Sequence, residues 1–284
     1  MEKHSGHCFC GAVTWEHTGE GTRNLNCHCD ECRRGVAGAF SSVKGLSADG
    51  LSIEGPWADY RYTEDSSRAF CTICGTRMWF RSDLWPDEVF MNVGALEKPE
   101  DHKPDQHVMT KEAVEWAEIA DDIPASHGFQ QATEGAPEGI TPQFEASEAL
   151  TGRCLCGDVA WETDEDPLWS GHCHCDSCRR ATGAPFTSFF GVPRDSVRWS
   201  GEMTAFASSD GGIERHFCKS CGCHLTVRSP RWPTEAHLYA ASLNDPSRFT
   251  ATAHFHYAEK LPWVALVDDA LRFPGSADTT EPLP

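Results

Sequence analysis

The sequence predicts a mainly β protein that is built from two tandem copies of one cysteine-rich domain. Three observations carry this prediction. Residues 6–16 are closely repeated as residues 152–162. Short stretches in which polar and apolar residues alternate recur in both copies, and such alternation is typical of half-buried strands. Fourteen of the fifteen cysteines stand at equivalent positions, seven in each copy.

The repeat covers nearly the whole chain. An offset of 146 residues places Cys27, Cys29 and Cys32 on Cys173, Cys175 and Cys178. After a one-residue insertion the offset is 147, and it relates the cysteines, arginines and glycines of 68–75 to those of 215–222. The same offset still relates His107 to His254, Trp116 to Trp263 and Asp121 to Asp268. A repeat of this length is the size of a small domain, so we expect domains at 1–127 and 151–275.

The segment between the copies, residues 128–150, has the composition of a linker. It contains four glutamates, three glycines, two prolines and no basic residue. We therefore expect a flexible acidic connection there, and a disordered tail over residues 276–284.

The expected strands come in matched pairs along the chain. They are 12–16 with 159–162, 77–81 with 224–228, and 88–93 with 236–241. The repeat predicts the second strand of each pair from the first. Residues 77–81 and 224–228 each directly follow a C-x-x-C turn. Helical signal is weak: 112–120 could form a short helix, but the matching 259–267 contains Pro262, which argues against it.

Charge and hydropathy limit the partners. The chain carries 43 acidic and 24 basic residues, a formal net charge of −19, which disfavours nucleic acid and anionic membranes as partners. Residues 1–11 lack the apolar run of a signal peptide, and no stretch approaches the ~18 apolar residues of a membrane span. We expect a reducing, cytoplasmic location, where clustered cysteines more often bind metal than form disulfides. The sequence does not indicate the oligomeric state.

The seven cysteines of each copy divide naturally into a closed and an open metal site. A four-sulfur tetrahedral site is structural, whereas three protein ligands leave one position for a substrate. Sulfur ligation favours zinc, with an iron–sulfur cluster as the alternative. The expected closed sites are Cys8, Cys10, Cys71 and Cys74 in the first copy and Cys154, Cys156, Cys218 and Cys221 in the second. The expected open sites are Cys27, Cys29 and Cys32, and Cys173, Cys175 and Cys178.

The open sites have two interpretations. Zn²⁺ with three thiolates has a net charge of −1 and is suited to holding a thiolate or a weakly activated carbonyl. Alternatively a protein group closes the site. His28 and His174 adjoin the ligands but are poorly placed to turn inward, whereas His107 and His254 could reach from elsewhere.

Several other repeated side chains have both a functional and a structural interpretation. The arginines beside the open sites could bind a substrate carboxylate, or could form surface pairs with neighbouring acidic residues; they are Arg33, Arg34, Arg179 and Arg180. We expect Arg68 and Arg215 to brace the closed sites, and Trp116 and Trp263 to lie in the core. His107 and His254 could transfer protons, but a structural role is favoured. The unmatched Cys223 is expected to be a buried, small apolar residue, with a redox or fourth-ligand role as the alternative.

Together these motifs resemble the glutathione-dependent formaldehyde-activating enzyme family, also called the centromere protein V-like family. The shared motifs are G-x-C-x-C-G-x-V, C-H-C-x-x-C-R-R, R-x-F-C-x-x-C-G and a final His…Trp…Asp segment, and both copies carry all four. The resemblance implies a β-tent fold with one structural and one catalytic zinc per domain, so four zinc ions per chain. This sequence departs from the family pattern in being duplicated and in having Cys223 where the first copy has Thr76.

The resemblance also implies a reaction. Members join glutathione and formaldehyde into S-hydroxymethylglutathione, so the first hypothesis is a zinc-dependent carbon–sulfur lyase-like enzyme acting on a thiol adduct of an aldehyde. The six cysteines of the open sites would be catalytic, and the four arginines would bind glutathione as co-substrate. The alternative is a non-catalytic tandem zinc scaffold that binds a protein partner. Binding to chromatin or microtubules fits poorly, because both are polyanions and the chain is strongly acidic.

Overall fold

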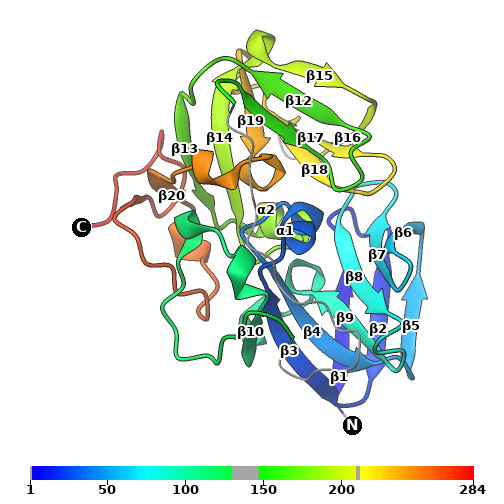
Figure 1. Cartoon of the computed structure of the whole chain (residues 1–284). Coiled ribbons are helices and arrows are strands. Elements are labelled where there is room, and N and C mark those ends of the chain that lie inside the picture. The colour runs from blue at the N-terminus through cyan, green and yellow to red at the C-terminus, as the bar shows by residue number, and fades with distance from the viewer. Residues whose placement is uncertain (1, 130–146, 209–211) are drawn as a thin grey trace.

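The structure is a computed structural model that describes residues 2–129, 147–208 and 212–284. It confirms a mainly β fold in two copies, with the second copy above the first in the view of Figure 1. Each copy pairs a small antiparallel sheet with a larger one. The small sheets are β1 (Lys3–His7), β2 (Thr14–Thr18) and β5 (Leu51–Glu54) in the first copy, and β11 (Leu150–Arg153), β12 (Ala160–Thr163) and β15 (Arg198–Ser200) in the second.

The large sheets have the same strand order except that the second has one further edge strand, β21, so the repeat in sequence is a repeat in structure. In the first copy the order is β10 (Gln106–Val108), β3 (Gly21–Cys27), β4 (Ser41–Ser47), β9 (Glu88–Asn92), β8 (Arg77–Ser82), β7 (Ser66–Cys71) and β6 (Trp57–Thr63). In the second it is β21 (Leu271–Arg272), β20 (Ala253–Phe255), β13 (Trp169–Cys173), β14 (Thr187–Pro193), β19 (Glu235–Tyr239), β18 (His224–Arg228), β17 (Glu214–Cys218) and β16 (Met203–Ala207). The six expected strand segments all lie on strands, with ends shifted by up to two residues.

In the described part of the chain, two α-helices and several 3₁₀ turns connect the strands. The helices are α1 (Asp30–Val36) and α2 (Asp176–Thr182), and the sequence analysis missed both. The short helix that was considered over 112–120, and that Pro262 argued against, does not form. That region holds the 3₁₀ turns η3 (Thr110–Glu112) and η4 (Glu115–Ala117), with extended backbone at Ala113 and Val114 between them. The remaining 3₁₀ turns are η1 (Val93–Ala95), η2 (Pro99–Asp101), η5 (Arg194–Ser196), η6 (Ala240–Ser242), η7 (Pro246–Arg248) and η8 (Tyr257–Glu259).

Each copy has a segment that crosses to the other copy. These crossing segments are residues 114–120 of the first copy and 261–267 of the second. Trp116 of the first copy packs against the core of the second, where its ring meets Phe249 edge-on at 4.9 Å. Trp263 of the second copy packs against the core of the first and donates from Nε1 to the Pro99 carbonyl at 2.9 Å. Each tryptophan is therefore half-buried and packs against a core, as expected, but the core is that of the other copy.

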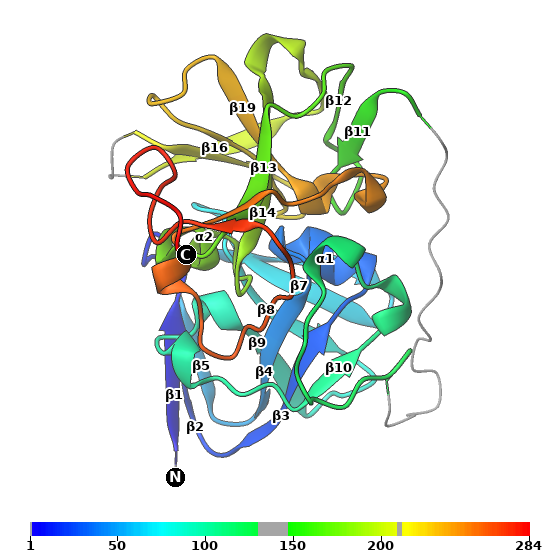
Figure 2. The same ribbon diagram turned by 90° about the vertical axis from the view of Figure 1, so that its left-hand side faces the viewer.

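Backbone hydrogen bonds join the crossing segments to each other. The Ala120 N–H donates to the Ala265 carbonyl and the Val267 N–H to the Glu118 carbonyl, both at 3.0 Å. Figure 2 shows the first segment (green) passing α1 and the second (orange to red) passing α2. Because the two crossings are reciprocal, the copies meet as the subunits of a twofold-symmetric dimer do.

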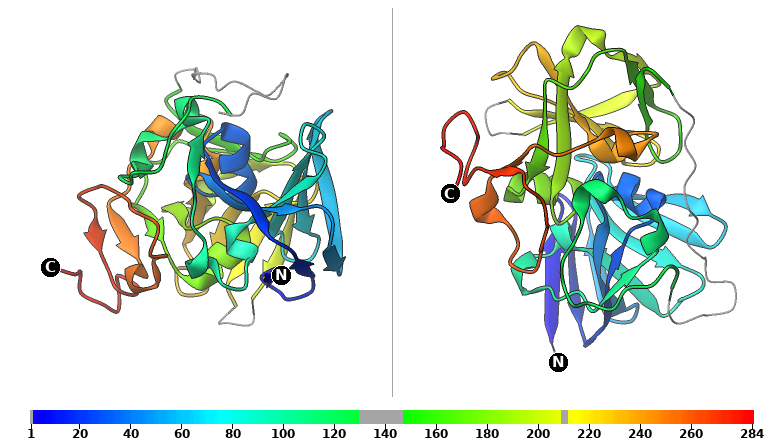
Figure 3. Two further views of the ribbon diagram at one scale, coloured as in Figure 1. Left: turned by 90° about the horizontal axis from the view of Figure 1, so that it is seen from below. Right: turned by 60° about the vertical axis from the view of Figure 1, so that its left-hand side comes forward.

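The helices lie where the copies meet. The Gly94 N–H donates to the Gly183 carbonyl at 3.0 Å, and the Phe40 and Phe186 rings pack edge to face at 5.8 Å. Arg34 of α1 reaches three backbone carbonyls of the second copy: those of Arg153, Ser242 and Leu243. The right-hand view of Figure 3 shows the two sheet-rich halves stacked against each other over these contacts.

The expected linker falls mostly outside the described residues, since 130–146 are not among them. Strand β11 begins at Leu150, which had been assigned to the linker. The tail, expected to be disordered over 276–284, makes defined contacts instead. Asp278 pairs with Arg231, and the Leu283 N–H donates to the Arg272 carbonyl at 2.7 Å. Among the described residues, no helix is long and apolar enough to cross a membrane.

Candidate metal centres

The first copy gathers four sulfurs between two turns. Cys8 and Cys10 follow β1, and Cys71 and Cys74 flank the turn after β7. The four Sγ atoms lie within 4.8 Å of one another, with Cys8 and Cys10 at 3.4 Å and Cys10 and Cys71 at 3.8 Å. Four sulfurs around zinc at 2.3 Å form a tetrahedron with edges of about 3.8 Å. The donor set and its spacing therefore fit a structural zinc.

The second copy repeats this cluster with Cys154, Cys156, Cys218 and Cys221. Cys154 and Cys156 are 3.3 Å apart, and Cys156 and Cys218 are 3.5 Å apart. In both copies a glycine ends the turn, Gly75 at φ 76° and Gly222 at φ 71°, in the left-handed region that a side chain rarely adopts. The C-x-x-C-G pattern thus allows the turn to close at its glycine, with both cysteine sulfurs directed into one cluster.

The thiols of this kind of site need a cation. Burial raises the pKa of Cys10 to about 12, so its thiolate is unfavourable unless a positive charge compensates it. Backbone donors also face the sulfurs: the Val13 N–H lies 3.2 Å from Cys8 Sγ and the Val159 N–H 3.3 Å from Cys154 Sγ. A divalent metal at this point would supply the remaining compensation.

The other three cysteines of the first copy converge at the start of α1. Cys27 ends β3, Cys29 caps the helix and Cys32 lies in its first turn. Cys27 and Cys29 Sγ are 3.6 Å apart, and the Cys32 N–H donates to Cys29 Sγ at 3.4 Å. A helix N-terminus favours negative charge, so this position stabilises thiolates.

The second copy builds the same three-sulfur cluster at the start of α2 with Cys173, Cys175 and Cys178. Cys173 and Cys175 Sγ are 3.5 Å apart, and the Cys178 N–H donates to Cys175 Sγ at 3.3 Å. In the part of the chain that the structure describes, no fourth histidine, cysteine or carboxylate joins either cluster.

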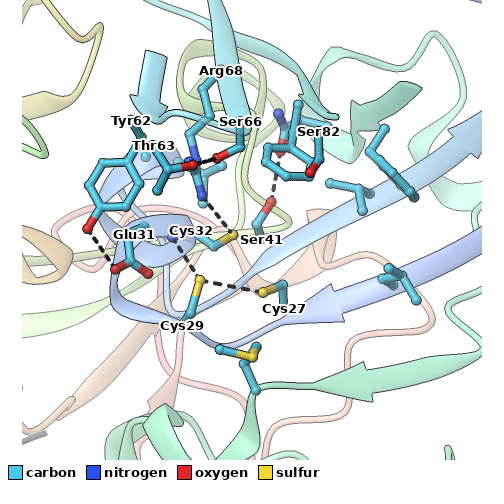
Figure 4. Close-up of a pocket in the computed structure, with 18 of the residues that line it drawn as sticks. Cys27, Cys29, Glu31, Cys32, Ser41, Tyr62, Thr63, Ser66, Arg68 and Ser82 are labelled. Atoms are coloured by element: carbon cyan, nitrogen blue, oxygen red, sulfur yellow. Dashed lines mark hydrogen bonds between the residues drawn. The ribbon is translucent and has the colours of Figure 1, made fainter. Parts of the chain in front are cut away.

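Each three-sulfur cluster opens into a cavity of its own. The first has a volume of about 360 Å³ and is lined by Cys27, Cys29 and Cys32 together with Arg68 and Tyr62 (Figure 4). The second has a volume of about 960 Å³ and contains Cys173, Cys175 and Cys178 in its wall, together with Arg215. A three-sulfur cluster that faces a cavity can hold a metal and still admit a ligand.

The histidines that were considered as fourth ligands form buried chains instead. His28 Nε2 and His107 Nδ1 are 2.9 Å apart, and His107 Nε2 lies 3.2 Å from Asp121. The second copy repeats the chain at 2.9 Å and 2.9–3.0 Å with His174, His254 and Asp268. Burial, with His107 and Arg33 nearby, lowers the pKa of His28 to about 3, so its ring is neutral. The geometry favours the structural interpretation of these histidines.

Two glutamates that the sequence analysis missed accept hydrogen bonds from the N-termini of the two helices. Glu112 Oε2 accepts from the Asp30 N–H, and Glu259 Oε2 from the Asp176 N–H, both at 2.9 Å. The glutamates are 147 residues apart, so their equivalence in the repeat was the available signal. Each one satisfies a free N–H group in the first turn of the helix that carries the open site.

The four arginines expected to bind substrate carboxylates are directed elsewhere. Arg33 donates to Asp30 and to the Glu112 carbonyl, and Arg34 donates to Asp30 and to the second copy. Arg179 donates to the carbonyls of His174 and Glu259, and Arg180 to that of Leu96 at 3.4 Å. None of the four lines either cavity. They pair with acidic neighbours, as in the alternative interpretation: Asp30 in the first copy and Asp176 in the second. These are not surface pairs, however, because Arg33, Arg34 and Arg179 are buried.

Arg68 and Arg215 were expected to brace the closed sites. They face the open sites instead, so this prediction is wrong. Arg68 Nη2 lies 3.6 Å from Cys32 Sγ (Figure 4). Although burial opposes it, the pKa of Arg68 is raised, first by Cys32 and then by Cys29. Hydrogen bonds from Cys27 and Cys29, together with Arg68, hold the pKa of Cys32 well below its usual range. Arg215 lies in the same way beside Cys178.

Comparison with known proteins identifies the family. The family described as glutathione-dependent formaldehyde-activating enzyme matches residues 3–112 and again residues 149–259. The chain belongs to this family. The two matches are the two copies, so this member of the glutathione-dependent formaldehyde-activating family is a tandem duplication.

Individual relatives are similar to parts of the chain. A Halomonas elongata protein is 31% identical over 126 residues, which cover 41% of this chain and 80% of that protein. A Podospora anserina protein is 36% identical, covering 32% of this chain and 44% of that protein; both are provisionally named glutathione-dependent formaldehyde-activating enzymes. An uncharacterized lyase of Schizosaccharomyces pombe is 37% identical over 30% of this chain and 56% of its own length. A crystal structure of a Rhodobacter sphaeroides protein shares 23% identity over 33% of this chain and 86% of that one, with a TM-score of 0.29.

Proposed function

We propose that the protein is a zinc-dependent, carbon–sulfur lyase-like enzyme that forms or cleaves the adduct of a thiol and an aldehyde. The observation that carries the proposal is the three-sulfur cluster that faces a cavity beside a buried arginine, found in both copies. The family name and the names of the relatives make glutathione and formaldehyde the first pair to test.

The residues present fit the metal. Cys27, Cys29 and Cys32 in one copy, and Cys173, Cys175 and Cys178 in the other, would hold one zinc ion each. When bound, zinc supplies a position of modest Lewis acidity that takes up a thiolate or a carbonyl oxygen.

The chain's own groups prepare the reaction in three ways. The N-terminus of α1 and the charge of Arg68 favour a thiolate at Cys32. The cavity holds thiol and aldehyde close together, which replaces an encounter in solution by a step between neighbours. The apolar wall, with Leu25, Val43 and Phe80, limits the water around the reacting atoms.

The reaction balances without a further reagent. The thiol gives up its proton, the thiolate sulfur forms a bond to the aldehyde carbon, and the electron pair of the carbonyl π bond moves to oxygen. The oxygen then takes up one proton, so that thiol and aldehyde together give the hydroxyalkyl thioether. Cleavage is the reverse of these steps.

Exchange NMR tests the proposal. Glutathione and formaldehyde are mixed with the zinc-loaded protein, and the exchange rate between free and adduct signals is compared with the spontaneous rate. We expect acceleration by the wild type, and the spontaneous rate for the double variant Cys29→Ser, Cys175→Ser. Metal analysis should find four zinc ions in the wild type and two in the double variant. A wild type that holds four zinc ions and accelerates no thiol–aldehyde pair would favour the scaffold alternative.

A further inference from the structure

Each open site has a buried arginine with hydrogen-bond donors that no protein group uses. Arg68 is 7% exposed and Arg215 is 3% exposed, and both line their cavities. In the described residues, Arg68 Nη1 has no hydrogen-bond partner, and neither have Nε and Nη1 of Arg215. A buried guanidinium whose donors are unpaired is costly, so such donors indicate a place for an acceptor that enters the cavity.

The first copy places a carboxylate of its own beside this arginine. Arg68 lies over the Tyr62 ring at 5.4 Å, and the Tyr62 hydroxyl donates to Glu31 Oε1 at 2.9 Å (Figure 4). The Glu31 carboxylate is among the groups that favour the charged form of Arg68. A second anion that approached Arg68 would therefore meet the like charge of Glu31 inside the same cavity.

Strand register identifies the equivalent positions in the second copy. Tyr60 pairs with Arg68 across β6 and β7, and Phe206 pairs with Arg215 across β16 and β17. Two residues onward β6 has a bulge, so that Tyr62 and Thr63 together stand opposite Ser66, where Ser208 alone stands opposite Ile213 in the second copy. The position of Glu31 within α1 is Ser177 within α2, between Cys175 and Cys178. The second copy has thus lost both the carboxylate and the phenol that held it.

The surroundings of Arg215 leave its edge available. One face of the guanidinium lies over the ring of Phe9, which comes from the first copy, at 4.6 Å. Stacking fixes the plane of an arginine and leaves the N–H groups at its edge for a planar acceptor. The second cavity is also larger, about 960 Å³ against about 360 Å³. The other arginine in its wall, Arg231, already pairs with Asp278.

We infer that Arg215 anchors a carboxylate of the thiol substrate, and that the second site is specific for carboxylate-bearing thiols whereas Glu31 excludes them from the first. The inference rests on the proposed function and adds a division of labour to it. The discriminating residues are Glu31 with Tyr62 in one copy and Ser177 with Ser208 in the other. A like charge that is built in against the wrong ligand is an effective source of specificity.

Reciprocal substitutions between the copies test this division. The zinc-loaded full chain is titrated by calorimetry with 3-mercaptopropionate, and with 2-mercaptoethanol as the neutral thiol. We expect one tight equivalent of 3-mercaptopropionate in the wild type. Ser177→Glu should weaken it by about tenfold or more, because a carboxylate then stands beside Arg215. Glu31→Ser should add a second equivalent, while 2-mercaptoethanol binding stays unchanged in both variants.

Both variants copy a sequence that the other copy already uses, Cys-Asp-Glu-Cys or Cys-Asp-Ser-Cys, so four zinc ions should remain in each. Two equal equivalents in the wild type, or unchanged affinity in Ser177→Glu, would overturn the inference. Should Ser177→Glu not fold, Glu31→Ser decides alone by the presence or absence of the second equivalent. Exchange NMR with 2-mercaptoethanol and formaldehyde separates the two proposals. Acceleration of this exchange without a preference for 3-mercaptopropionate contradicts only the proposed specificity of the second site. A preference for 3-mercaptopropionate without acceleration contradicts only the proposed enzymatic activity.

Discussion

Cys223 and Thr76 occupy one position of the repeat and make one contact each across the interface between the copies. Thr76 Oγ1 donates to the Arg180 carbonyl, and Cys223 Sγ donates to the Arg34 carbonyl, both at 3.1 Å. Burial raises the pKa of Cys223 well above its usual value, so the thiol keeps the proton that it donates. Cys223 belongs to none of the metal clusters among the described residues, and its burial agrees with the favoured interpretation of the sequence.

This equivalence predicts which substitutions Cys223 tolerates. Cys223→Thr should keep the contact and the stability, whereas Cys223→Ala should lose about 1 kcal/mol, because the Arg34 carbonyl is left without this donor. Chemical denaturation of the zinc-loaded protein measures both. Zinc content should stay at four in each variant. A lost zinc ion in Cys223→Thr would mean that the thiol is a ligand after all.

Two buried histidines should make the stability depend on pH. Burial, with Lys44 nearby, lowers the pKa of His102 to about 3, and burial, with His254 nearby, lowers that of His172 to about 3. Both pKa values lie below the 6.5 of an unfolded histidine, so below pH 6.5 the unfolded chain binds protons that the folded chain does not. The free energy of unfolding therefore falls as the pH falls through 6.5 towards 3, and at pH 5.5 each histidine lowers it by about 1.4 kcal/mol relative to its value well above pH 6.5.

The other copy again supplies the control. His102 corresponds to Phe249 and His172 to Asn26, so His102→Phe with His172→Asn introduces residues that the fold already uses at these places. Denaturation at pH 7.0 and 5.5 should show a smaller loss of stability in the double variant than in the wild type. Equal losses would show that these histidines do not cause the dependence, since protonation of the cysteines is common to both proteins.

At the level of elements, the sequence predicted strands and cysteine clusters better than helices and arginine contacts. A cysteine cluster is set by local spacing, such as C-x-C-x-x-C, because a short turn and the start of a helix bring these sulfurs together. The helix α1 has seven residues and buries Arg33 and Arg34, so it has no apolar stripe for a period of 3.6 to reveal. Its stability comes from Cys29 and Glu112, and the glutamate lies far away in the sequence.

The role of each arginine depended on contacts that spacing does not encode. Arg33 and Arg34 adjoin the ligands in sequence but point to Asp30 and to the second copy. Arg68 is distant from Cys32 in sequence, and its long side chain reaches from β7 to the Cys32 sulfur in the first turn of α1. Proximity along the chain was the only guide available, and for these residues it pointed to the wrong site.

The crossing segments should stabilise the copy that they enter. Trp116→Ala should destabilise the second copy, because the ring leaves a gap beside His172 and Phe249, and Trp263→Ala should destabilise the first. We expect a loss of up to about 3 kcal/mol for each half-buried ring. Hydrogen exchange followed by mass spectrometry should show faster exchange in β13 and β14 for Trp116→Ala, and in β4 and β9 for Trp263→Ala. Faster exchange confined to the copy that supplies the tryptophan would contradict the exchange of segments.

At the scale of the whole molecule, the sequence suggested two domains on a linker, and the structure shows two copies packed as one body. The interface is not symmetric in strength. Arg34 is 4% exposed and donates to three carbonyls of the second copy at 2.9–3.1 Å, whereas its counterpart Arg180 donates to one carbonyl of the first at 3.4 Å. Hydrogen bonds from a charged group contribute more than neutral ones, and their loss leaves buried carbonyls unpaired.

This asymmetry predicts how the protein unfolds. The wild type, loaded with zinc, should unfold in one transition whose calorimetric and van't Hoff enthalpies agree, because neither copy keeps a complete core without the other. Arg34→Ala removes three crossing hydrogen bonds, so it should weaken the coupling enough to separate the transition into two. Arg180→Ala removes one long bond and should leave a single transition. Two transitions in the wild type would mean that the copies fold independently and that the crossing tryptophans add stability without cooperativity.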